Sequence, residues 1–202
     1  MSVIHFAVHW HQRGLTAAQK LDFLAPLLLR LYLAPIFILA GWHKLADLES
    51  TAYYFDYLGI PASLLMANLA GMAELLGGTG LLLGVGVRVC TLPLMVTMLV
   101  AAGTAHWDNG WHVLPETQLT MPWEWRNDLI AGASERKQAM ISLLQQHGHY
   151  EWLTATGSIT ILKNGVEFAA TYLLMLLALL YLGAGRFISV DYWLARQLKA
   201  AA

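Results

Sequence analysis

The chain alternates between long apolar runs and shorter polar connections. Four apolar runs lie at about residues 23–45, 61–84, 88–107 and 165–185. Each is close to the roughly 20 residues that a helix needs to cross the hydrocarbon core of a bilayer. The pattern therefore predicts an all-α fold, an integral membrane four-helix bundle, in which residues 1–202 form a single transmembrane domain.

The connections between the runs differ in length and character. Residues 85–87 separate the second and third runs, so these helices are expected to be antiparallel neighbours. The segment 46–60 is amphipathic and is expected along the membrane interface. Residues 108–162 form a long polar loop, in which 134–148 favours an amphipathic helix and the β-branched segment 150–162 favours a small hairpin.

Composition and charge support a membrane protein and exclude one class of partner. The sequence is 57% hydrophobic and only 12% charged, which is outside the usual range of soluble domains. A formal net charge of -1 argues against nucleic acid, because phosphate binding needs clustered Lys and Arg. The distribution of Lys and Arg favours both termini in the cytoplasm, with the loop 108–162 outside the membrane on the other side.

The single cysteine, Cys90, limits the redox chemistry that the chain can perform alone. One cysteine can form no internal disulfide and no CxxC redox pair. Any redox role must therefore depend on a bound cofactor or on a partner.

Charged side chains inside the apolar runs are the strongest functional signal. Arg30, Glu74 and Glu167 fall within runs, and Lys44 and His106 lie at run ends. A charge at the bilayer centre costs at least about 2.5 kcal/mol, so such groups usually face the bundle interior and find partners. Arg30 and Lys44 lie within about 40° of each other around the first helix at about 100° per residue.

This spacing predicts a polar seam through the bundle. Arg30 would pair with Glu74 towards the cytoplasm, and Lys44 would meet Glu167 and His106 towards the outside. The alternative interpretation is that these groups only lock helix packing, or that Lys44 extends to the lipid headgroups.

Aromatic and histidine side chains gather where the third run meets the loop. An indole ring suits the aromatic belt at a membrane interface, and this explains five tryptophans: Trp107, Trp111, Trp123, Trp125 and Trp152. His106 ends the third run, and histidine can be neutral or charged near physiological pH, so it is suited to proton transfer.

A metal site is a weaker hypothesis. Its candidate ligands are His106, His112, His147 and His149, together with Glu116, Glu151 or Glu167. Imidazole and carboxylate groups together suit several divalent metals, but the spacing does not establish that they converge, and loop hydrogen bonding is the alternative. Near the amino terminus, His5 and His9 could share a helical face, although an interfacial amphipathic segment is the favoured interpretation.

Several stretches resemble the DoxX/DoxD-like family of small prokaryotic membrane proteins. These are "LLLRLYLAPIFILAGWHKL", "LGIPASL" and "AGMAELLGGTGLLLGVGVR", which with the third run cover about residues 24–107. The matching positions are Arg30, Gly41, Lys44, Gly59, Pro61, Glu74, Gly77, Gly84 and Arg88. The resemblance implies a four-helix protein of the prokaryotic inner membrane, with some relatives serving as subunits of thiosulfate:quinone oxidoreductase. Other relatives accompany thiol, oxidative-stress or metal-handling systems.

This sequence departs from the family pattern in two places. Pro35 is expected to interrupt the first run, and the loop 108–162 is long. Both departures count against a simple transfer of quinone chemistry.

Three functions are compatible with these features. The favoured one is a redox-associated, quinone-linked membrane subunit, with an oxidoreductase activity left open. Its catalytic candidates are Lys44, Glu74, His106 and Glu167, and its cofactor-binding candidates are Arg30, Lys44 and Trp107. A quinone is favoured over a metal ion as the cofactor.

The two alternatives belong to other classes. One is a small-ion or solute transporter with Glu74 as the central carboxylate. The other is a membrane anchor whose loop recruits a redox or metal-handling partner subunit. Gly77, Gly78 and Gly80 would let another helix approach closely, in this chain or in a second copy, so a homo-oligomer is also expected.

Overall fold

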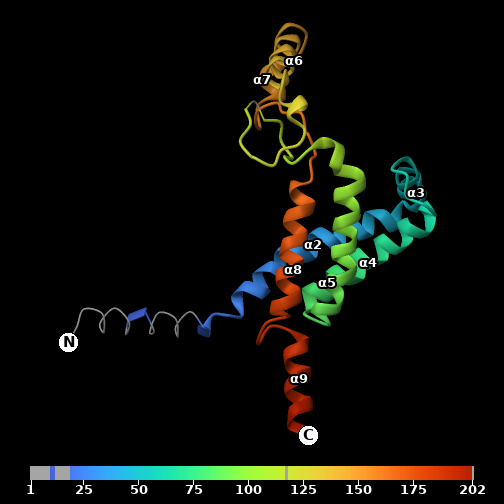
Figure 1. The fold of residues 1–202 in the computed structure, drawn as a ribbon, viewed down its shortest axis with the longest axis vertical. Coiled ribbons are helices and arrows are strands. Elements are labelled where there is room, and N and C mark those ends of the chain that lie inside the picture. The colour runs from blue at the N-terminus through green and yellow to red at the C-terminus, as the bar shows by residue number, and fades with distance from the viewer. Residues whose placement is uncertain (1–9, 12–18, 117, 202) are drawn as a thin grey trace. The chain divides into compact units, whose positions relative to one another are not determined.

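The predicted all-α class is confirmed. The computed structural model describes residues 10–11, 19–116 and 118–201, and this part of the chain contains helices and turns but no strand. Among these residues three helices are long and apolar enough to cross a membrane: α2 (Leu24–Ala46), α4 (Ser63–Leu83) and the stretch Val87–Asn109 that begins with α5 (Val87–Ala101). The chain is therefore a membrane protein by the length and composition of its helices (Figure 1).

The fourth apolar run forms a shorter helix than the other three. Helix α8 (Glu167–Leu182) has 16 residues. At a rise of about 1.5 Å per residue this is about 24 Å, against a hydrocarbon core of about 30 Å. A fourth membrane crossing therefore stays a prediction. Helix α9 (Val190–Ala201) follows after a short connection.

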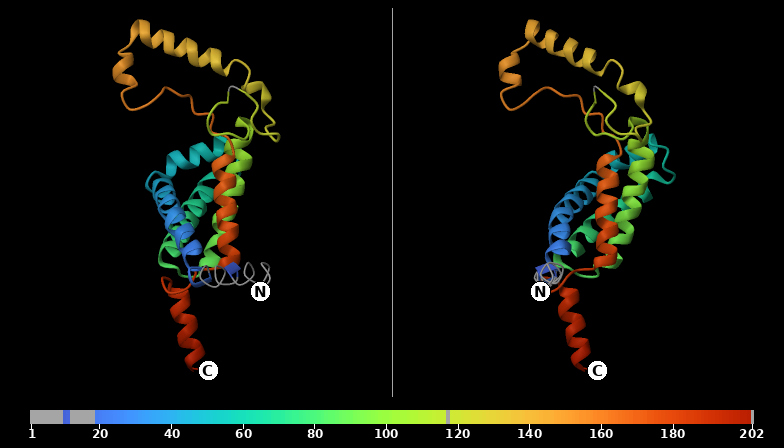
Figure 2. Two further views of the ribbon diagram at one scale, coloured as in Figure 1. Left: turned by 90° about the vertical axis from the view of Figure 1, so that its left-hand side faces the viewer. Right: turned by 60° about the vertical axis from the view of Figure 1, so that its left-hand side comes forward.

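The contacts divide the chain into two compact units, residues 1–97 with 173–202 and residues 98–172. In the first unit α2 runs beside α4, and α3 (Leu48–Tyr57) packs against α4 (Figure 2). Glycines permit this close approach. A Cβ atom on Gly41 would overlap the backbone of Leu75, and one on Gly78 would lie 2.9 Å from the backbone nitrogen of Ile38.

The expected interruption of the first run at Pro35 is wrong. Pro35 lies inside α2, which is continuous from Leu24 to Ala46. Proline removes one backbone hydrogen bond, but apolar helices tolerate this where neighbouring groups satisfy the freed carbonyl. Close to Pro35 the side chains of Leu33, Ala34 and Phe37 are fully buried, so this part of α2 is held by its packing.

The second unit contains the end of the third run and most of the loop. After α5 the chain widens into a π-helical turn, η1 (Ala102–His106), and ends in a 3-10 turn, η2 (Trp107–Asn109). A further 3-10 turn, η3 (Asn127–Leu129), precedes α6. Helix α6 (Ala133–His147) lies where the sequence predicts an amphipathic helix, and Gly148 ends it by donating its N–H to the carbonyl of Leu144.

The predicted hairpin at 150–162 is wrong. Its first residues form a short helix, α7 (Tyr150–Leu153), and no strand lies in the described part of the loop. Thr154 ends this helix with its hydroxyl donating to the carbonyl of Tyr150 at 2.8 Å. The β-branched residues that follow are not in strands, so a hydrogen-bonded ladder does not form.

Candidate functional site

A buried ion pair joins α2 to α4. The Nζ atom of Lys44 lies 2.5 Å from Oε2 of Glu74. The Glu74 side chain is 4% exposed and that of Lys44 is 27% exposed, so the acid is enclosed and the base is open on one side. Sequence reasoning selected both residues but not their pairing with each other.

The antiparallel register of α2 and α4 explains this pairing. Gly71 and Glu74 lie on the face of α4 that meets α2. A Cβ atom on Gly71 would be 2.8 Å from the Leu45 side chain and 3.3 Å from Cβ of Lys44. Because Gly71 has no side chain, the end of α2 comes close enough for Lys44 to reach Glu74.

Arg30 is a buried cation whose hydrogen bonds go to backbone carbonyls. It is 1% exposed, and its guanidinium donates to four backbone carbonyls. Two belong to the end of α4, Leu81 at 2.6 Å and Leu82 at 3.1 Å. The others belong to the connection after α8, Ala184 at 2.7 Å and Ile188 at 2.9 Å.

The predicted pair of Arg30 with Glu74 is therefore wrong. The last carbonyls of a helix lack intrahelical partners and carry partial negative charge, so they attract a guanidinium. The register places Arg30 beside the end of α4, while Glu74 lies about two turns earlier, opposite Lys44. One face of α2 carries both cations, and the salt bridge that it forms with Glu74 comes from Lys44.

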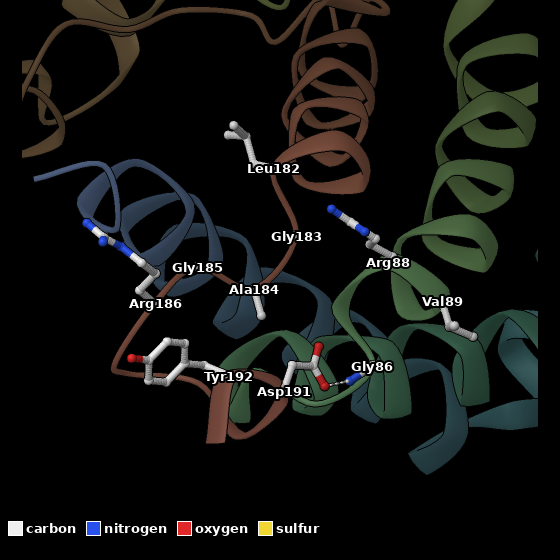
Figure 3. Close-up of a pocket in the computed structure, with 10 residues that line it drawn as sticks. All are labelled: Gly86, Arg88, Val89, Leu182, Gly183, Ala184, Gly185, Arg186, Asp191 and Tyr192. Carbon is white, nitrogen blue, oxygen red and sulfur yellow. Dashed lines mark hydrogen bonds between the residues drawn. The ribbon is translucent and has the colours of Figure 1, made fainter. Parts of the chain in front are cut away.

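Side chains from α2 and from the start of α9 contact the turn between α4 and α5. Asp191, at the start of α9, accepts the N–H group of Gly86 at 2.7 Å (Figure 3). It also accepts the N–H group of Val87 at 3.1 Å. Gly84 has a φ of 71°, and a Cβ atom there would collide with Arg30 and Ser189. Sequence reasoning missed Asp191, whose only signal is an acid at the first turn of an amphipathic helix.

His106 and Glu167 both lie in the second unit, where each contacts the loop. Nδ1 of His106 is 2.8 Å from the carbonyl oxygen of Asn164. Oε2 of Glu167 accepts the N–H of Val113 at 3.0 Å. Lys44 belongs to the first unit, where it pairs with Glu74, and its predicted grouping with His106 and Glu167 stays a prediction.

His112 lies between two carboxylates that the sequence had only suggested as neighbours. Its Nε2 is 2.9 Å from Oε1 of Glu116, and its Nδ1 is 3.6 Å from Oε2 of Glu167. Oε2 of Glu116 is buried and has no hydrogen-bond partner among the described residues. The imidazole therefore lies within hydrogen-bond distance of Glu116 and farther from Glu167.

The other proposed metal ligands do not join this cluster in a metal-binding group. His147 ends α6 and His149 precedes α7, and both are exposed. Within the described part of the chain no group of three or more His, Cys, Asp or Glu side chains is placed to hold a metal ion. His5 and His9 lie outside the described residues.

The loop is organised around Glu124, which sequence reasoning missed. Oε2 of Glu124 lies 2.6 Å from Nζ of Lys163, with side-chain exposures of 0% and 7%. Its carboxylate also accepts the N–H groups of Trp111 and Arg126. Burial alone would raise the pKa of Glu124, but these hydrogen bonds and the Lys163 charge outweigh it and lower the pKa below its usual value.

Trp107 has a partner within the loop. Its ring stacks on that of Trp125 with 4.7 Å between centroids. Nε1 of Trp125 donates to the Trp107 carbonyl at 3.0 Å. This stacking accounts for the position of Trp107 without a cofactor, although its ring stays about half exposed.

Part of the chain matches a known protein family. The family model DoxX matches residues 25–107, which include α2, α3, α4 and α5 and therefore both members of the Lys44–Glu74 pair. None of the curated proteins matches the chain, and none of the solved structures does.

Proposed function

Because residues 25–107 match the family model DoxX, we propose that this chain is a DoxX-like membrane protein that acts as a redox-associated, quinone-linked membrane subunit. The observation that carries the proposal is the Lys44–Glu74 ion pair at 2.5 Å inside the α2–α4 interface. An ionisable pair in a membrane-spanning segment is expensive to bury and usually marks a functional position. In this proposal a partner redox subunit supplies the electrons, and this chain binds the quinone and handles protons.

The exposure of the pair fits a ligand that arrives through the membrane. A lysine ammonium has three N–H donors, and Lys44 directs one to Glu74. The Lys44 side chain is 27% exposed, so an oxygen acceptor can approach its other donors.

Arg30 does not fit a role as a quinone ligand. All four of its hydrogen bonds go to backbone carbonyls, and the residue is 1% exposed. Moving the guanidinium to a ligand would break its hydrogen bonds to the carbonyls of Leu81 and Leu82 at the end of α4. The proposal therefore keeps Lys44 and Glu74 and assigns Arg30 to the framework that holds α2 against α4.

A quinone offers two carbonyl oxygens that take up protons when the ring is reduced. Lys44 would donate a hydrogen bond to such an oxygen and stabilise negative charge on it. Glu74 orients the amine and stands one hydrogen bond away as a proton acceptor and donor. Because Glu74 is enclosed, water competes poorly for this proton.

Photolabelling with an azido-quinone tests the proposal on the full-length protein in lipid nanodiscs. The informative variants are Lys44→Met, Glu74→Gln and the double charge swap K44E/E74K. The swap keeps an ion pair and therefore the packing, but it moves the amine into the enclosed position. Lys163→Met is the matched control, because it breaks the other buried Lys–Glu pair, in the loop.

We expect competable labelling of the wild type and of Lys163→Met, and loss of labelling in Lys44→Met and in the folded swap. Labelling of the folded swap at the wild-type level would mean that the pair only locks the helices together. Absence of label on the wild type would refute quinone binding. The alternatives would then be transport, tested by flux into vesicles, and partner recruitment, tested by replacing the loop.

A further inference from the structure

A cavity of about 370 Å³ lies where α5 begins and α8 ends, and the function proposed above does not use it. Its lining includes Arg88 and Val89 from α5, Leu182 at the end of α8, and Asp191 and Tyr192 from α9. Small-molecule sites occupy about 300–1,000 Å³, so the volume is sufficient for a ligand headgroup. Figure 3 shows Arg88 extending towards Gly183 from one side, with Asp191 and Tyr192 on another.

Arg88 is the available cation of this cavity. It is exposed, and its Nη2 donates to the Tyr181 carbonyl at 3.2 Å. A guanidinium has five N–H donors, so several can still meet an acceptor. Arg186 also lines the cavity but forms an ion pair with Asp22 at 2.6 Å, and Figure 3 shows its side chain directed away from Arg88.

The acidic residue of the cavity does not cancel this charge. Both carboxylate oxygens of Asp191 accept backbone N–H groups, from Gly86 and Val87. The carboxylate therefore has its own partners at the turn. Gly183 keeps the space beside Arg88 open, because a Cβ atom there would lie 3.3 Å from Nε of Arg88.

Two exposed apolar side chains border the cavity. Val89 is 71% exposed and Leu182 is 53% exposed, and both belong to apolar segments that end here. A cationic group at the end of membrane helices, beside exposed aliphatic side chains, matches a molecule with an anionic head and apolar chains. Basic pockets between membrane helices bind anionic lipid headgroups in this way.

We propose that this cavity binds the phosphate of an anionic phospholipid, with Arg88 as its principal ligand. Arginine is the side chain best suited to a phosphate, because two parallel N–H groups match two of its oxygens. The acyl chains of the lipid lie against Val89 and Leu182. The site is separate from the Lys44–Glu74 pair, at the opposite end of α4 from α3.

Native mass spectrometry of the detergent-purified full-length protein tests this site. Phosphatidylglycerol is the probe, phosphatidylcholine is the zwitterionic comparison, and inorganic phosphate and glycerol phosphate are the soluble competitors. Arg88→Gln removes the ligand. Arg196→Gln is the matched control, because it removes an exposed arginine from α9 that does not line the cavity. A second variant, Val89→Glu, places a negative charge at the rim without changing Arg88.

We expect Arg88→Gln and Val89→Glu to weaken phosphatidylglycerol retention about tenfold or more, since a charge-assisted pair contributes at least that factor. Arg196→Gln should retain the lipid as the wild type does. Equal losses in Arg88→Gln and Arg196→Gln would reduce the effect to overall charge and overturn the site. Displacement of the lipid by inorganic phosphate at equal concentration would overturn the lipid as ligand and assign the site to soluble phosphate.

Discussion

Replacing Arg30 with methionine should destabilise the first unit far more than replacing the exposed Arg88. The substitution keeps an apolar side chain in the buried space but removes the donors of four hydrogen bonds. The carbonyls of Leu81 and Ala184 are bonded in buried positions. Those of Leu82 and Ile188 are bonded in partly buried positions, where water can take over.

The size of the effect follows from the two buried carbonyls. Orphaning a buried acceptor costs about 1–3 kcal/mol, and bonds from a charged donor lie at the upper end of this range. In Arg30→Met the carbonyl of Ala184 loses its bond from Arg30, whereas that of Leu81 still accepts the N–H of Gly84 at 3.3 Å. One orphaned carbonyl and one weakened carbonyl predict a loss of about 2–4 kcal/mol in the free energy of unfolding. Arg30→Lys should lose less stability than Arg30→Met, because an ammonium keeps the positive charge. It should still lose some, because an ammonium cannot bond all the separate carbonyls that the guanidinium reaches.

Unfolding in mixed micelles, driven by a rising fraction of denaturing detergent and followed by tryptophan fluorescence, measures this loss. Arg88→Met is the control, because the exposed Arg88 makes one bond to a carbonyl and should cost less than about 1 kcal/mol. A loss below about 1 kcal/mol in Arg30→Met would refute the idea that Arg30 holds the end of α4.

Two further predictions concern the helix interface and the loop. Gly41→Ala should destabilise the α2–α4 pair by about 1–3 kcal/mol, because the added Cβ atom meets the backbone of Leu75. Gly103 has open space around it, so Gly103→Ala should be neutral or stabilising in the same detergent unfolding experiment. The lowered pKa of Glu124 means that its stabilisation is fully present above the usual glutamate range and is lost as pH falls through the folded-state value. Hydrogen exchange of the Trp111 amide, corrected for its intrinsic rate, should therefore accelerate in acid. Glu124→Gln should abolish this pH dependence. An identical acid response in the variant would contradict the role of the Glu124 carboxylate in holding the Trp111 amide.

The helices could be predicted from the sequence because hydrophobic length is a local property. The apolar runs predicted α2, α4 and α5 within a few residues, and the amphipathic pattern predicted α6. The hairpin at 150–162 failed because β-branched residues form strands only with a partner, which is a non-local condition. The predicted helix interruption at Pro35 was wrong because buried side chains on both sides of Pro35 keep α2 continuous.

The candidate residues of the site could be selected from sequence, but their partners could not. A charge in an apolar run is visible in one dimension, which is why Arg30, Lys44 and Glu74 were chosen. Their pairing depends on the helix register, and a shift of about two turns exchanges one partner for another. Asp191 and Glu124 were missed because their partners are backbone N–H groups, which have no signature in the sequence.

Redox-induced infrared difference spectroscopy, with quinone reconstituted into the purified protein, addresses the role of the Lys44–Glu74 pair most directly. Reduction of the quinone should produce a carboxyl C=O band from a change in the protonation of Glu74. This band should disappear in Glu74→Gln and persist in Glu167→Gln, which removes the membrane-run acid that contacts the loop. A band that survives unchanged in Glu74→Gln, in a protein that still binds the quinone, would contradict a proton-handling role for the pair.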